Sequence, residues 1–250
     1  MLARRASSRR LLEGPLEQHH VRECSVDALA DVGRGWIQTV GDFEDAIDAE
    51  FDLRREMAAR SGLPLTMTLL QKEARPEEWR DLLGRIAAAN AEGLRITAQI
   101  RGRPTSVLLG FELSINPFSA CPSWAEVKDL AFAARMARLR DPALRARLIS
   151  EPCGDIIRKR RFQQWDRIFP FGDPPQYEPD PDTSIAAEAA RRGVTPAELA
   201  YDLMLEGDGR TILYRPTTNY ANGDLAVVHE MLDHPNTLIG LGDGGAHVGV

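Results

Sequence analysis

Short apolar runs alternate with amphipathic helical patterns in the N-terminal part of the chain, and this alternation constrains the fold more than any other feature. Strands are predicted at Trp36–Val40, Pro64–Leu70 and Leu94–Ile100, and helices at Phe43–Arg60 and Pro76–Asn90 between them. Each strand and its helix take up about thirty residues, as in right-handed crossovers between parallel strands. The sequence therefore predicts an α/β fold with a parallel sheet.

The rhythm changes after Ile100. Arg101–Phe118 is predicted to be a long loop insertion after the third strand, on a face where loops often line pockets. Pro170–Pro181 is rich in proline and is interpreted as a surface excursion. Later helices are predicted at Ser123–Ile149, Thr183–Arg192, Thr195–Leu205 and Gly223–Asp233. Later strands are predicted at Thr211–Tyr214 and Thr237–Leu241. One domain is expected over residues 25–250, after a poorly ordered tail over residues 1–24.

Composition excludes several classes of protein. The chain is 43% hydrophobic and 27% charged, which is typical of soluble globular proteins. Its net charge of −6 argues against nucleic acids and anionic membranes as general partners. With no apolar run of membrane-spanning length and no signal peptide, we expect a cytoplasmic protein. Cys24, Cys121 and Cys153 are expected to be reduced thiols, because they are widely spaced and form no CxxC pair.

The last residues, Thr237–Val250, read TLIGLGDGGAHVGV. An apolar run that ends in glycines around Asp243 is typical of a buried parallel strand that delivers a carboxylate to the carboxyl end of a sheet. Asp243 is therefore the first candidate for catalysis and metal binding. The alternative is a turn aspartate that binds its own backbone.

Other polar side chains are placed where they could bind a small molecule. Gln71 and Gln99 lie at predicted strand ends, and their amides can hydrogen-bond an amide substrate. Arg103 can clamp a substrate carboxylate, or it can pair with Glu112 across the predicted loop. Asn219 is a further candidate, because it follows a predicted strand. His247 is the last candidate: it could contact a substrate or a metal, or its imidazole could hydrogen-bond to the backbone of its own loop.

Four segments carry a resemblance to a known family: Thr66–Gln71, Arg101–Phe118, Leu139–Ile149 and, most specifically, Asn219–His247. They resemble the D-aminoacylase, or N-acyl-D-amino-acid deacylase, branch of the amidohydrolase superfamily (amidohydrolase family 3). The resemblance implies a TIM-type (β/α) barrel, of which this chain would form a part. It also implies hydrolysis of a carbon–nitrogen amide bond by metal-activated water, with Asp243 as the general base and acid and zinc as the expected metal.

The chain also departs from that family. The family carries an HxH pair on its first barrel strand, and the chain has none. Two more histidine ligands are expected at the ends of the first two predicted strands, where Thr39, Val40, Leu69 and Leu70 stand instead. The resemblance therefore implies a fragment that lacks the N-terminal half and the extreme C-terminus of the barrel protein.

Three functions follow as hypotheses. The first is a hydrolase of small amides such as N-acyl-D-amino acids. The second is a catalytically inactive remnant or binding subunit without the metal ligands. The third is an amide-transforming enzyme that works without metal through Asp243 and the strand-end glutamines. In each case the expected partner is a small-molecule amide.

Overall fold

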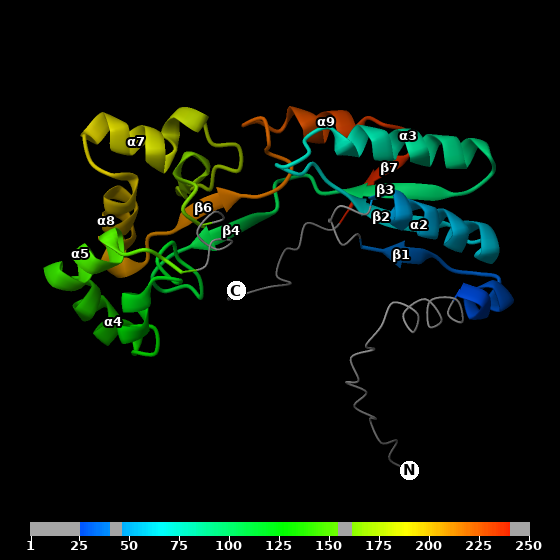
Figure 1. Ribbon diagram of the computed structural model, residues 1–250. Helices are drawn as coiled ribbons and strands as arrows, with labels where there is room; N and C mark the ends of the chain where they lie inside the picture. Colours follow the sequence, from blue (N-terminus) through cyan, green and yellow to red (C-terminus); the bar gives the residue numbers. More distant parts are fainter. Residues whose placement is uncertain (1–25, 41–46, 155–161, 241–250) are drawn as a thin grey trace, which may run out of the picture. The chain divides into compact units, whose positions relative to one another are not determined.

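The computed structural model describes residues 26–40, 47–154 and 162–240 of the chain (Figure 1). Two compact units are formed. Unit 1 comprises Met1–Thr68 and Asp81–Gln99, and unit 2 comprises Leu69–Arg80 and Ile100–Val250. Buried apolar side chains occur in both units, among them Leu65 and Ile86 in unit 1 and Leu109 and Tyr201 in unit 2.

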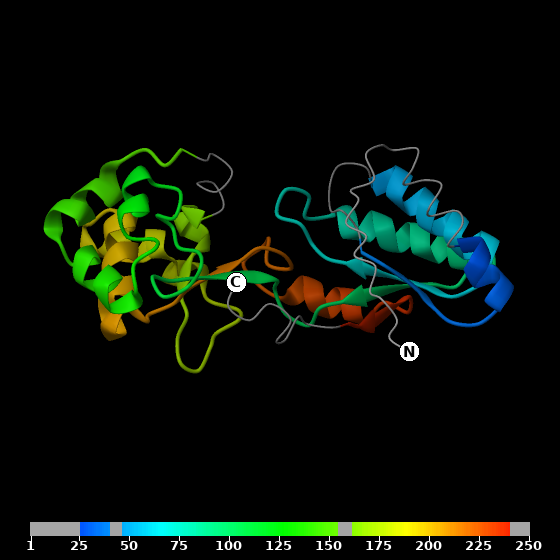
Figure 2. The ribbon, with the colours of Figure 1, turned by 90° about the horizontal axis from the view of Figure 1, so that it is seen from below.

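Unit 1 holds the alternating part of the chain. Its elements are β1 (Ile37–Thr39), α2 (Ile47–Ser61), β2 (Leu65–Leu69), most of α3 (Glu78–Ala91) and β3 (Ile96–Ile100), and residues 26–32 form a further helix. β1 and β2 pair in parallel, with Ile37 opposite Leu65. The helices α2 and α3 run alongside these strands in both ribbon views (Figures 1 and 2). Apolar residues recur on one face of α3, and Leu82, Leu83 and Ile86 are buried there.

The parallel sheet has four strands in the order β1-β2-β3-β7, where β7 is Thr237–Ile239. Within unit 2, the end of β7 meets the end of β3, because Gly240 N donates to Ile100 O at 2.8 Å. The predicted α/β fold with parallel strands is confirmed. Among the described residues the strands form an open sheet and not a closed barrel.

A second, antiparallel sheet lies in unit 2, in the order β4-β6-β5. Its strands are β4 (Ser106–Leu109), β6 (Leu213–Pro216) and β5 (Phe169–Pro170). The interpretation of Arg101–Phe118 as one long loop is therefore wrong in part, since β4 pairs with β6 along Ser106–Leu109. The strand predicted near Thr211–Tyr214 exists as β6, but its partners run antiparallel to it, and the proline-rich segment begins as β5.

Unit 2 also contains helices. They are η1 (Pro122–Glu126), α4 (Phe132–Leu139), α5 (Pro142–Ser150), η2 (Trp165–Arg167), η3 (Pro181–Thr183), α7 (Ile185–Arg192), α8 (Pro196–Gly209) and α9 (Ala226–Leu232). The predicted capping box starts α8, where the Thr195 side chain accepts from Glu198 N and Glu198 accepts from Thr195 N. Further along α8, Tyr201 packs edge-on against Phe111 and Phe118, with 5.1 and 5.3 Å between the ring centroids.

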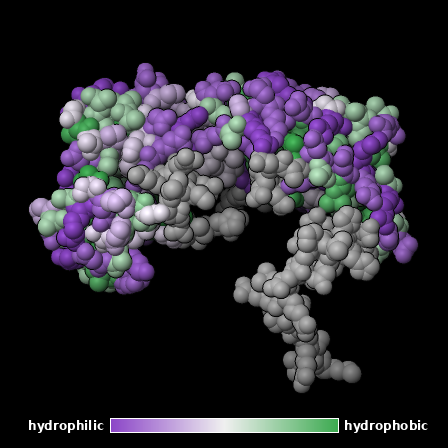
Figure 3. All heavy atoms as spheres, viewed as in Figure 1, coloured by the Kyte–Doolittle hydropathy of each residue, from purple (hydrophilic) through white to green (hydrophobic). Residues whose placement is uncertain are grey.

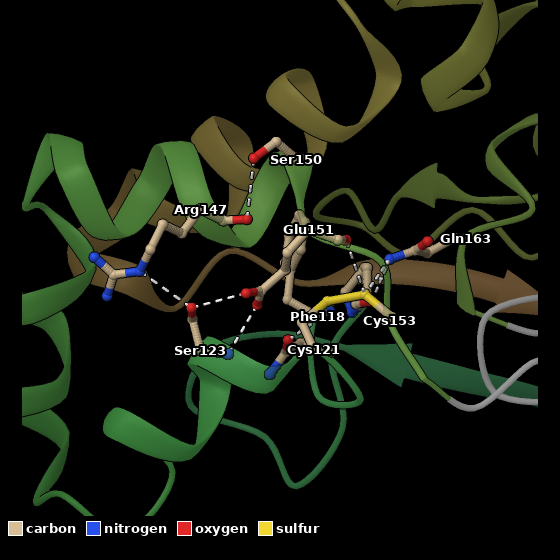
Figure 4. Close-up of a disulfide and its surroundings, with 10 residues drawn as sticks. Phe118, Cys121, Ser123, Arg147, Ser150, Glu151, Cys153 and Gln163 are labelled. Atoms are coloured by element: carbon tan, nitrogen blue, oxygen red, sulfur yellow. Dashed lines mark hydrogen bonds between the residues drawn. A yellow bond between two sulfur atoms is a disulfide. The ribbon is translucent and has the colours of Figure 1, made fainter.

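Cys121 and Cys153 form a disulfide (Figure 4). The prediction that these two residues are free thiols is therefore wrong. The sequence separation of 32 residues gave no local signal for the pairing. Beside the disulfide, Glu151 accepts from both the backbone and the hydroxyl of Ser123, each at 2.8 Å, so it fastens the end of α5 to η1. Cys24 lies outside the described residues.

The face drawn in Figure 3 is dominated by hydrophilic side chains, with hydrophobic ones scattered between them. Over the described residues, every helix is too short or too polar to cross a bilayer.

Candidate site at the carboxyl ends of the parallel strands

Three segments that each follow a strand are joined by hydrogen bonds to Asn219. Gln71 follows β2, Arg101 follows β3 and Asn219 follows β6. Gln71 N donates to Asn219 Oδ1 at 2.8 Å, and Asn219 N donates back to Gln71 O at 3.0 Å. Asn219 Nδ2 also donates to Arg101 O at 3.4 Å. All three residues belong to unit 2.

Asn219 is fully buried and has a φ of 58°. This left-handed backbone is open to asparagine more readily than to most residues, because its short polar side chain can bond locally. The conformation turns the chain sharply after β6 so that backbone and side chain both face Gln71. Two of the candidate residues chosen from the sequence, Gln71 and Asn219, are therefore brought together.

The side chain of Gln71 is held in one orientation. It is 1% exposed, and its Oε1 accepts from Ala221 N at 2.9 Å. Only the oxygen of the amide can accept from that N–H, so Nε2 occupies the other position. Among the described residues Nε2 has no hydrogen-bond partner. A buried donor without a partner costs about 1–3 kcal/mol, so this group calls for an explanation.

An ion pair between the buried Arg215 and the half-buried Glu73 supports this edge. Arg215, which is 2% exposed, donates from two nitrogens to the two oxygens of Glu73 at 3.1 and 2.9 Å. Arg215 also donates to Gln164 Oε1 at 2.7 Å. Arg167 approaches the same carboxylate at 3.7 Å and donates to Ala221 O at 2.8 Å. The pair thus holds the segment after Gln71 against β6 and η2.

Two titrating groups beside the site are held in one charge state. Burial acts to raise the pKa of the Glu78 carboxyl, but hydrogen bonds and charge from Lys72 and Arg75 lower it overall. Glu78 is therefore a carboxylate at neutral pH and a structural partner of those cations. Burial raises the pKa of the Tyr220 hydroxyl to about 12. Tyr220 therefore stays protonated and donates to Pro179 O.

Gly240 brings the end of β7 to the same edge, through its bond to Ile100 O. Asp243 follows three residues later. Asp243 and His247 themselves lie outside the described residues.

The remaining candidates make contacts of their own. In unit 1, Gln99 donates to Thr66 Oγ1 at 3.0 Å. In unit 2, the guanidinium of Arg103 stacks over the ring of Tyr177 at 5.5 Å. Glu112 is exposed and pairs with Arg210 at 3.6 Å. The structure thus gives Glu112 a structural partner.

A resident zinc ion does not fit the donors that the structure describes. Across residues 26–40, 47–154 and 162–240, no three His, Cys, Asp or Glu side chains gather closely enough to hold a metal. The groups at the strand ends are amides and backbone carbonyls, and amide oxygens bind zinc poorly.

Sequence reasoning missed Glu73, Arg215 and Thr105. Thr105 O accepts from Thr217 N at 2.7 Å and from the Thr217 hydroxyl at 2.8 Å, which joins the chain after β3 to the chain after β6. The one available signal was an arginine, Arg215, within an apolar strand pattern, since a buried arginine requires an acid partner.

No family model matches the chain, and no curated protein matches it. Two solved structures are similar to it at 13% sequence identity. One is a D-aminoacylase mutant in complex with copper chloride, with a TM-score of 0.34, over 82% of this chain and 32% of the other. The second is a D-aminoacylase described as defining a subset of amidohydrolases, with a TM-score of 0.30, over 81% and 31%. The chain spans about a third of the length of either protein.

Proposed function

We propose that this chain belongs to an amidohydrolase-like hydrolase that cleaves the carbon–nitrogen bond of small amides, in the manner of an N-acyl-D-amino-acid deacylase. One observation carries the proposal: the hydrogen bond from Gly240 N to Ile100 O, which leads the chain to the carboxyl end of β3 just before the GDGG motif. The carboxyl ends of parallel strands are where α/β enzymes place their catalytic groups.

Asp243 is the proposed acid and base. A carboxylate there can take a proton from the attacking water and return it to the leaving nitrogen, which balances the hydrolysis of an amide to a carboxylate and an amine. Arg103 is proposed to bind the substrate carboxylate, because its planar guanidinium offers two parallel donors. Asn219 holds the strand ends in place. No step is assigned to zinc, since the described donors do not form a site for it.

The test is release of amine from N-acetyl-D-leucine by the purified chain, with and without added zinc. Asp243→Asn should lower turnover by about a hundredfold or more, because a positioned acid–base group contributes that much. The matched control is Asp233→Asn, which changes an exposed aspartate just after α9 and should leave turnover unchanged. No amine release from a folded chain under either condition, or equal turnover in both variants, would overturn the proposal.

A second candidate is a binding unit without catalysis. It is favoured by the donors at the strand ends, which are amides suited to hydrogen bonding and not to holding a metal. Saturable binding of N-acetyl-D-leucine without any amine release would support this candidate over the hydrolase.

A further inference from the structure

Among the described residues, Gln71 Nε2 is a buried hydrogen-bond donor without a partner, and no role has yet been assigned to it. Trp79 Nε1 and Asn116 Nδ2 are the other buried side-chain donors without a partner in the described parts of the chain. Trp79 lies in α3, and Asn116 lies between β4 and η1, so neither follows a strand of the parallel sheet. Gln71 alone of the three stands at a strand end.

Every other polar group of Gln71 is already engaged. Its backbone N–H and C=O are both bonded to Asn219, and its Oε1 accepts from Ala221 N. These three bonds fix the position of Nε2 and prevent the amide from rotating to find a partner of its own. None of the described residues supplies an acceptor for this fixed and buried donor, and an acceptor on a bound molecule would satisfy it.

We propose that Gln71 Nε2 donates a hydrogen bond to the carbonyl oxygen of the bound amide. A neutral N–H is enough to satisfy a neutral carbonyl in a buried position, whereas a buried carboxylate would also need a cation to offset the loss of its hydration. The nearby cations already bind other groups: Arg101 donates to Thr105 Oγ1 at 2.6 Å, and Arg215 holds Glu73. The inference rests on the proposed function, for which it names the residue that recognises the acyl carbonyl.

The experiment uses N-acetyl-D-leucine, whose carboxyl stays ionised between about pH 5 and 8, and measures its binding to the full chain by calorimetry. Gln71→Glu keeps an oxygen for Ala221 N but puts a second oxygen in place of the free donor. Binding should weaken about ten- to hundredfold at pH near 8. It should recover as the pH falls to about 5, because burial raises the pKa of a carboxyl, and the protonated form has an O–H to donate.

Gln38→Glu is the matched control, since Gln38 is an exposed glutamine in β1 and the same exchange there should leave affinity unchanged at both pH values. A second measurement needs no variant. In the unaltered chain, the side-chain amide protons of Gln71 should shift downfield in NMR spectra when the ligand is added.

The inference is overturned if the unaltered chain does not bind the ligand, if Gln71→Glu binds equally well, or if the amide protons of Gln71 do not move. Binding that depends on Gln71 in a chain that releases no amine would overturn hydrolysis and leave carbonyl recognition standing. The two proposals therefore fail separately.

Discussion

Units 1 and 2 are stabilised by contacts of different range along the sequence. In unit 1, Asn90 closes a local clamp, donating to Ile96 O and accepting from Ile96 N, only six residues away. In unit 2, Asn219 closes a similar clamp on Gln71, 148 residues away. Both clamps satisfy backbone groups with one amide. The comparison teaches that short-range patterns can specify unit 1, whereas unit 2 depends on long-range polar links.

The largest expected effect tests those links. Glu73→Ala should lower the free energy of unfolding of unit 2 by about 3–5 kcal/mol, because it leaves the buried guanidinium of Arg215 without its carboxylate. Urea unfolding followed by amide hydrogen exchange measures the loss in each unit.

The control is Asp202→Asn, which breaks the more exposed pair with Arg145 and should cost below about 1 kcal/mol. Equal costs for the two variants would show that the Glu73 link contributes no more than a surface pair.

The disulfide is a covalent link of the same kind. Cys153→Ser should lower the free energy of unfolding by about 3 kcal/mol, because the closed loop restricts the unfolded chain. Thermal unfolding with and without a thiol reductant measures it. Reductant should destabilise the unaltered chain and leave the Cys153→Ser variant unchanged. A variant as stable as the oxidised chain would contradict the expectation.

The smallest effect is expected in unit 1. Asn90→Ala should cost about 1–2 kcal/mol, since it frees Ile96 N and Ile96 O at the start of β3. Hydrogen exchange at Ile96 should quicken while unit 2 keeps its protection. Loss of protection in both units would break the comparison, because it would show that they unfold together.

The predicted elements of unit 1 match the structure to within a few residues. The strand expected at Pro64–Leu70 is β2, and the one expected at Leu94–Ile100 is β3. Period and burial agree there: Ile96, Ala98 and Ile100 are buried and the residues between them are half-buried. Local patterns are sufficient where each element packs against its neighbour in sequence.

Unit 2 could be predicted only in part. The capping box at Thr195 identified the start of α8, because its bonds lie within one turn. The antiparallel pairing of β4 with β6 could not be predicted, since the partners are about a hundred residues apart and no turn joins them. Gln71 and Asn219 were each predicted as candidates from the sequence. Their contact with each other could not be predicted, because the two residues are 148 positions apart.

The disulfide also determines the effect of a single cut in the backbone between Cys121 and Cys153. α4 and α5 lie between Cys121 and Cys153, inside a ring closed by the sulfur bond. A protease that cuts once within that ring opens the polypeptide without releasing either fragment. The nicked protein would migrate as one species on a gel run without reductant, and it would separate into two pieces only after reduction.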